Sequence, residues 1–261
     1  MKTFAIITPT IGGPELEKCI LSLHGQNCKQ YLVVDGREHF SAVSRVLDNL
    51  PADIRGFSEE NVSTIYLEEN IGRVGGNWYG HRAFAAASFL VNEDVLCYLD
   101  PDNWVEPNYI DAFREVLDDP EYQWAYTLRK IVDPQGKYIC HDDCENLGHW
   151  PVMGTEDRYH IDTGCFAVPR AIALKVGHNW YGQWGADRQF FGALKEFAPK
   201  FGCTNKYTLN YRLGGATNMA TQEMFLRGNE ITSKLYKGEF PWQSLRARKP
   251  MTLTYQTTTP K

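Results

Sequence analysis

The sequence predicts one α/β domain: a mainly parallel, twisted sheet flanked by helices, with a smaller C-terminal region packed on the same sheet. The chain has 261 residues, a size that suits a single large domain. Short apolar segments alternate with amphipathic ones through the first half, as in strand–helix–strand units with right-handed crossovers. No internal repeat and no Gly/Ser-rich linker divides the chain.

Apolar segments of the first half predict strands at residues 4–8, 31–34, 64–67 and 95–99. Between them, apolar residues recur at helical spacing from Leu16 to Leu23, and residues 77–91 are apolar almost all round, as expected of a helix enclosed in a core. A further helix is expected to begin at Pro107. Because ligands bind outside the carboxyl ends of parallel strands, the polar residues after each strand are the first candidates for a site.

The second half is less regular. Strand-like segments occupy residues 124–132, 165–168 and 206–211, and residues 187–197 form an amphipathic helical segment. Residues 241–261 contain four basic residues and no acidic one, and predict an extended tail that is either solvated or folded over an anionic substrate.

Composition excludes several classes of protein. The chain has 27 Lys+Arg against 32 Asp+Glu, a net charge of −5, and no basic run, so we expect no nucleic-acid partner. The N-terminal apolar stretch is too short for the core of a signal peptide. The longest apolar stretch, residues 83–91, is far below the roughly 20 residues of a membrane span, so we expect no transmembrane segment and a cytoplasmic location.

The 7 cysteines are scattered, and most read as small buried residues. Cys140 and Cys144, with His149 downstream, are residue types that bind zinc, but no second CxxC or HxxxH pair follows them. We therefore expect a loop here rather than a metal site.

The segment from Tyr98 to Asn103 carries two carboxylates, Asp100 and Asp102, directly after a predicted buried strand. In an extended segment they point to the same side, and Pro101 biases Asp100 toward extended geometry. Paired carboxylates suit Mg²⁺ or Mn²⁺, which take one or two of them with substrate phosphates and waters. The alternative is an Asp-rich turn before a helix.

Five motifs in order resemble the family 2 nucleotide-sugar glycosyltransferases of GT-A fold. The motifs are a strand ending in Thr8-Pro9-Thr10, a second strand ending in Asp35-Gly36, residues 70–77, the D-x-D at 100–102, and Trp184-Gly185-Ala186-Asp187-Arg188. The resemblance is good from Met1 to about Ile110 and patchy from there to Gly215. It implies a GT-A fold over residues 1–240, with a nucleotide-binding half (1–110) and an acceptor-side half (111–240).

The resemblance also implies roles for individual residues. The nucleotide-sugar would contact Thr8, Pro9, Thr10, Asp35, Asn70, Arg73, Gly76, Asn77 and Asp100. Asp35 would accept from a ring N–H of the base, and Asn77 would approach the donor from the start of its helix. Asp100 and Asp102 would form the site for Mn²⁺ or Mg²⁺, and Asp187 would be the catalytic base. Candidates on the acceptor or sugar side are Asp162, Trp184 and Arg212.

The chemistry of sugar transfer calls for such residues. A cation offsets the charge that grows on the leaving nucleoside diphosphate, and a carboxylate takes the proton of the acceptor hydroxyl. Asp102 and Asp187 meet these two needs. We therefore predict a metal-dependent glycosyltransferase, inverting by direct displacement, that uses a UDP- or GDP-sugar and an acceptor that is a glycan, a lipid-linked compound or a small molecule.

Alternatives stay open at several positions. Asp187 could be a helix N-cap, Asp162 part of a turn, and Arg212 a surface residue. The aromatic residues Trp180, Tyr181 and Trp184 favour a sugar platform near Asp187, although core packing is the default for any single Trp.

The sequence also departs from the family at two places. Residue 103 is Asn where a further Asp is common, and no His follows His178 as a late metal ligand. Among other functions, a sugar nucleotidyltransferase needs a basic Gly-rich loop after the first strand, which residues 11–15 lack. The remaining alternative is a nucleotide-sugar-binding module whose catalytic set has decayed.

Overall fold

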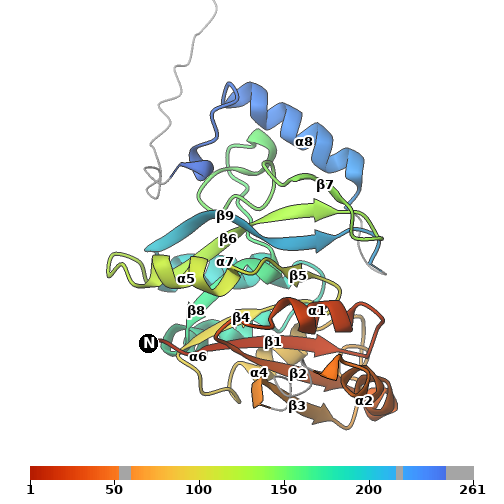
Figure 1. Ribbon diagram of the computed structural model, residues 1–261. Coiled ribbons are helices and arrows are strands. Elements are labelled where there is room, and N and C mark those ends of the chain that lie inside the picture. Colours follow the sequence, from red (N-terminus) through yellow and green to blue (C-terminus); the bar gives the residue numbers. More distant parts are fainter. Residues whose placement is uncertain (53–59, 216–219, 245–261) are drawn as a thin grey trace, which may run out of the picture.

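A computed structural model describes residues 1–52, 60–215 and 220–244. They fold around one 9-stranded sheet with the order β3-β2-β1-β4-β8-β6-β9-β5, in which β7 pairs with β6. In Figure 1 the N-terminal strands form the lower part of the molecule and α8 lies at its top. Of the predicted basic tail, residues 245–261 lie outside the described residues.

The first four strands are parallel, as predicted. They are β1 (Phe4–Thr10), β2 (Lys29–Asp35), β3 (Val62–Leu67) and β4 (Val95–Tyr98). Every residue of β1 is buried because strands pair with both of its edges and helices cover the sheet. The helices described in this half include α1 (Leu16–Ser22), α2 (Phe40–Asp48) and α4 (His81–Ala87).

The second half of the chain adds antiparallel strand pairs to the sheet. Its strands are β5 (Trp104–Val105), β6 (Trp124–Val132), β7 (Tyr138–His141), β8 (Phe166–Pro169) and β9 (Phe201–Arg212). Strand β8 is antiparallel to both β4 and β6, whereas β6 and β9 are parallel. The helices are α5 (Tyr109–Leu117), α6 (Arg170–Val176), α7 (Ala186–Phe197) and α8 (Gln222–Leu235). The predicted packing of this half on the same sheet is confirmed.

Two predicted elements differ in the structure. The helix expected over residues 77–91 is only α4, so Asn77 lies in a loop and not at a helix start. Gly75, Gly76 and Tyr79 have positive φ there, which a helix does not accommodate. Cys140, expected in a loop, lies in β7.

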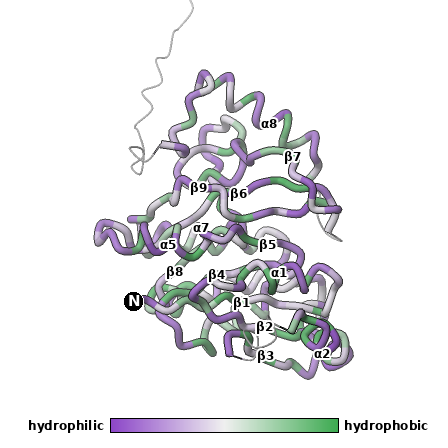
Figure 2. Tube along the Cα trace, in the orientation of Figure 1, coloured by the Kyte–Doolittle hydropathy of each residue, from purple (hydrophilic) through white to green (hydrophobic). Residues whose placement is uncertain are grey.

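The core is strongly aromatic around α7. Trp180 is fully buried, stacks on Phe190 with ring centroids 4.4 Å apart, and contacts Tyr98 at 4.8 Å. Trp180 is therefore a packing residue, and its expected contribution to a sugar platform is wrong. Figure 2 shows that hydrophilic and hydrophobic positions alternate along α8. Within the described ranges, no helix is both long and apolar enough to span a membrane.

Candidate active site

A cleft of about 760 Å³ opens beyond the carboxyl ends of β1 and β4, facing loops of the second half. Six residues predicted from the sequence line it: Asp100, Asp102, Asp162, Trp184, Asp187 and Arg212. The first and last of them, Asp100 and Arg212, are 112 positions apart in the sequence. The fold thus brings the expected carboxylates together at the sheet edge where ligands bind in α/β proteins.

Asp100 and Asp102 are positioned by a turn rather than by the extended segment that was expected. The amide of Asn103 donates to the carbonyl of Asp100 at 3.2 Å and closes the turn. The side chain of Asn103, 2% exposed, accepts from the backbone N–H of Arg212 at 3.0 Å. Asn103 therefore connects this turn to the end of β9.

Negative charge concentrates at this turn. Burial raises the pKa of Asp100 well above its usual range, and the charges of Asp102, Asp162 and Asp187 raise it further. Burial also raises the pKa of Asp102, while the nearby Arg212 opposes the rise. Two carboxylates that resist ionising next to each other are a donor set of the type that Mg²⁺ and Mn²⁺ accept.

Arg212 is held at the cleft wall beside Asp102. Its Nη2 lies 2.9 Å from Oε1 of Glu15, and its Nε donates to the carbonyl of Pro134 at 2.9 Å. The side chain is 16% exposed, so Arg212 is not the surface residue of the alternative interpretation.

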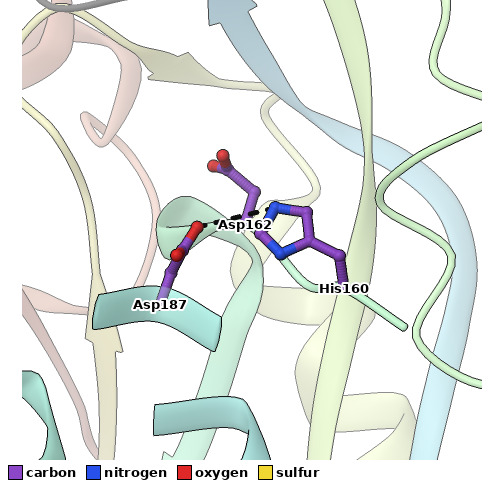
Figure 3. Close-up of side chains that lie close together, drawn as sticks. All are labelled: His160, Asp162 and Asp187. Carbon is purple, nitrogen blue, oxygen red and sulfur yellow. Dashed lines mark ion pairs between the residues drawn. The ribbon is translucent and has the colours of Figure 1, made fainter. Parts of the chain in front are cut away.

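Asp187 lies in the first turn of α7. The helix is capped by Gly185, whose φ of 87° is left-handed, and Oδ1 of Asp187 accepts from the next amide, Arg188 N, at 2.8 Å. The interpretation of Asp187 as the N-cap is therefore wrong. Its Oδ2 lies 3.5 Å from Nε2 of His160. In Figure 3 a dashed line joins Asp187 to His160, and Asp162 lies beside this pair; the ligand atoms of the three residues all lie within 4.8 Å of one another.

Arg129 is a cleft residue that sequence reasoning missed. This side chain of β6 is 1% exposed and donates to Asp142 at 2.7 Å, to Glu145 at 2.6 Å and to Asp162 at 2.5 Å. Burial alone would lower its pKa, but the three carboxylates raise it well above its usual value. An Arg inside an apolar strand was the available signal, because such a charge needs partners when buried.

Asp162 serves both the cleft and this ion-pair cluster. One oxygen binds Arg129 and the other accepts from Gly164 N at 3.3 Å, which makes Asp162 the N-cap of a short 3₁₀ turn, Thr163–Cys165. The turn expected as the alternative role of Asp162 is present, and the side chain also lines the cleft.

The remaining predicted nucleotide-binding residues lie outside the cleft lining. Thr8 is fully buried and accepts from Gln30 at 3.1 Å, and Thr10 accepts from Gly12 N at 3.0 Å. Asp35 accepts from the amides of Ile71 at 2.8 Å and Gly72 at 3.0 Å. Pro9, Asn70, Arg73, Gly76 and Asn77 also lie beyond the lining. Asp35 thus fixes the start of the 70–80 loop.

That loop reaches the cleft through Tyr79 and His81. The Nδ1 atom of His81 lies 3.0 Å from the carbonyl of Gly182, which ties the loop to the segment carrying Trp184. Trp184 is 58% exposed, and the Arg188 guanidinium lies 4.8 Å from its ring. An exposed indole at the mouth of a polar cleft offers a flat apolar surface beside Asp187.

Cys140, Cys144 and His149 do not form a metal site. The Cys144 thiol donates to Asp142 at 3.4 Å, and the His149 ring stacks on Phe201 with centroids 3.9 Å apart. Across residues 1–52, 60–215 and 220–244, the cluster of three His, Cys, Asp or Glu side chains whose ligand atoms all lie within 4.8 Å of one another is His160, Asp162 and Asp187, and it includes neither cysteine nor His149.

The fold is similar to that of S. aureus TarS. TarS 1–349 in complex with UDP-GlcNAc matches with a TM-score of 0.58 and 12% identity over 90% of this chain. The complex with UDP matches with a TM-score of 0.56 and 14% identity. This chain spans 66% and 65% of the length of those two chains, and 44% of a further TarS structure that matches with a TM-score of 0.57. The predicted GT-A-like α/β fold is confirmed.

Sequence comparison identifies one relative. A Haemophilus influenzae protein described as "Uncharacterized protein" is 33% identical in an alignment 100 residues long that covers 32% of this chain and 68% of that protein. No protein-family model matches the chain.

Proposed function

The chain belongs to the same family as the uncharacterized Haemophilus influenzae protein, and we propose that it is a metal-dependent glycosyltransferase of the family 2 type. It transfers a sugar from a UDP- or GDP-sugar to an acceptor hydroxyl. The observation that carries the proposal is the meeting of Asp102 and Asp187 across one cleft, in a fold similar to that of a protein crystallised with UDP-GlcNAc.

The donor diphosphate lies at the β4 end of the cleft. Asp100 and Asp102 would hold Mn²⁺ or Mg²⁺, and the bound cation would offset the charge of the leaving diphosphate. Arg212, beside Asp102 and anchored by Glu15, supplies a fixed positive charge on the same side. Because Arg212 is already held in place, little side-chain entropy is lost when the diphosphate binds.

The nucleoside lies toward the end of β2. Base and ribose lie against Thr8, Pro9, Thr10 and Asp35, which are buried next to the cleft and outside its lining, with Asn70, Arg73, Gly76 and Asn77 on the facing loop. Asp35 already accepts two backbone amides, and a carboxylate has lone pairs left for a ring N–H. The glycine at position 76 leaves room for a close approach of the donor.

Asp187 is the base. It takes the proton of the acceptor hydroxyl while the acceptor oxygen bonds to the sugar carbon and the bond to the diphosphate breaks on the opposite face, so the configuration inverts. Trp184 and Asp162 lie on the acceptor or sugar side. The acceptor is a glycan, a lipid-linked compound or a small molecule with a free hydroxyl.

The test is release of nucleoside diphosphate from a panel of UDP- and GDP-sugars, UDP-GlcNAc first, with Mn²⁺ and with water as the minimal acceptor. We expect Asp187→Asn to lower turnover by about 10²–10⁴-fold, the usual contribution of a positioned base, while nucleotide binding stays unchanged.

We expect the turnover of Asp102→Asn to be the same with and without Mn²⁺. Asp111→Asn, at an exposed position of α5, is the matched control. Equal turnover of Asp187→Asn and the wild type would exclude Asp187 as the base.

A further inference from the structure

His160 is a buried imidazole aimed at the candidate base. It is 4% exposed and lines the cleft, and its Nε2 lies 3.5 Å from Oδ2 of Asp187 (Figure 3). Its Nδ1 is buried and has no hydrogen-bond partner among the described residues. A neutral imidazole carries a proton on one nitrogen only. Nε2 faces the Asp187 carboxylate and Nδ1 faces no partner among the described residues, so the tautomer with its N–H at Nε2 fits this geometry.

The backbone around His160 is fixed on both sides. Its carbonyl accepts from Gly148 N at 3.0 Å, and the amide two residues later, Asp162 N, donates to Asn146 at 2.7 Å. Ile161 between them is fully buried. The imidazole is therefore presented at one position, set by packing rather than by its contact with Asp187.

The other groups around Asp187 do not orient its outer oxygen. The Arg188 amide binds Oδ1, and Asp100 and Asp162 repel the carboxylate, since each has its pKa raised by the charge of Asp187. His81 senses the same charge, but its Nδ1 faces the carbonyl of Gly182. Among the residues that the structure describes, this leaves His160 as the group in contact with Oδ2.

We propose that His160 is a positioning residue for Asp187: it donates from Nε2 to Oδ2 and holds the carboxylate so that its free lone pairs face the acceptor hydroxyl. The inference rests on the proposed role of Asp187 as base. The proton that leaves the acceptor goes to Asp187, and His160 exchanges no proton and forms no bond to substrate. It acts by fixing the direction from which the base approaches.

Two substitutions separate this role from simple packing. His160→Leu removes the donor while filling much of the space, and His160→Gln keeps an N–H donor at a similar reach. With UDP-sugar and Mn²⁺, we expect His160→Leu to lower kcat roughly 10- to 100-fold, as for partners that orient a reacting carboxylate or imidazole, with unchanged affinity for UDP. His160→Gln restores most of the loss.

The double variant gives the sharpest comparison. Adding His160→Leu to Asp187→Asn should cost nothing further, because the group that His160 positions is already gone. An equal loss in both backgrounds, or failure of His160→Gln to rescue a folded protein, would overturn the positioning role.

A second readout does not depend on turnover. In protein labelled with ¹⁵N-histidine, the Nε2 resonance of His160 is assigned as the one that disappears in His160→Gln. We expect its chemical shift in the wild type to be that of a protonated nitrogen. We also expect this shift to change in Asp187→Asn. An unprotonated Nε2, or no shift, would overturn the proposed contact whether or not the protein transfers sugar. Absence of wild-type turnover on every donor would instead refute the proposed function and leave the NMR result to decide the contact.

Discussion

At the scale of single residues, the burial of Asp100 beside other carboxylates lowers the stability of the fold. The ionised form of this residue is disfavoured by burial and by three neighbouring carboxylates. The folded state therefore binds a proton more tightly than the unfolded chain does, so the free energy of unfolding decreases as pH rises from the usual Asp value through the raised one. A cation bound between Asp100 and Asp102 removes this penalty.

Asp100→Asn should therefore stabilise the cation-free protein by about 0.5–2 kcal/mol near neutral pH, the range typical of relieving a strained functional residue. The gain should shrink on acidification, since the wild-type carboxyl is then protonated. Urea unfolding at several pH values measures it, with Asp111→Asn as the control. Equal stability of Asp100→Asn and the wild type at neutral pH would show that Asp100 carries no such penalty.

The acidic residues of the cleft could be predicted from the sequence, but the residues that pair with them could not. Asp100, Asp102 and Asp187 stand in short motifs, so their local pattern points to chemistry. Arg129 and His160 have no such pattern, because their partners are up to 33 residues away in sequence and become neighbours only in the folded chain. Which buried ion pairs form depends on tertiary structure.

At the scale of elements, β6 supports the second half through the Arg129 cluster. Burial would raise the pKa of Asp142, but the charge and hydrogen bonds of Arg129, with two backbone amides, lower it. The contribution of Asp142 to stability is thus present above the usual Asp pKa and lost as pH falls through the lowered value.

Arg129→Met leaves three carboxylates without their cation and should destabilise the protein by about 3–5 kcal/mol. The loss should be smaller at pH 5 than at pH 8, because the orphaned carboxyls can protonate. Chemical denaturation at both pH values measures this. Arg188→Met, which breaks a half-exposed pair at 3.8 Å, is the control and should cost less than about 1 kcal/mol. A small loss that does not depend on pH would contradict this account of the cluster.

Helix α7 supplies a second test at this scale. Gly185 caps it with φ of 87°, and its absent Cβ would meet little besides the Arg188 side chain at 3.9 Å. Gly185→Ala should therefore cost roughly 1–2 kcal/mol through backbone strain alone and displace Asp187. Gly192→Ala, in the same helix with open space around it, should stabilise by about 0.5–1 kcal/mol. Thermal unfolding compares the two, and a gain in both would contradict the strain at Gly185.

The elements that sequence reasoning missed have physical reasons. Helix α8 buries only Phe225, Gly228 and Thr232, so it has no continuous apolar stripe. Gly228 is there because a Cβ would lie 2.6 Å from the Cys144 sulfur. The loop before α4 looked helical because it is apolar, but Asp35 holds its start from another strand.

At the scale of the whole molecule, one sheet carries both halves of the cleft. Strands β1 and β4 end on the side of the cleft that carries Asp100 and Asp102, whereas Arg129 of β6, Asp162 from the turn before β8 and Arg212 of β9 line it from the second half. The alternation of the first half was readable because buried parallel strands are short continuous apolar segments. The antiparallel direction of β8 could not be predicted from the sequence, because strand direction depends on how the connections pack.

The most direct test of this account is the thermal stability of the full chain with UDP, GDP, CDP and TDP, each with and without Mn²⁺. Binding at 100 times the dissociation constant stabilises by about 2.7 kcal/mol, or roughly 5–10 °C in a protein of this size. We predict a shift of this order for UDP or GDP that requires Mn²⁺ and is absent in Asp102→Asn. No shift with any nucleotide, or an equal shift in Asp102→Asn, would contradict a metal-dependent nucleotide-sugar site in this cleft.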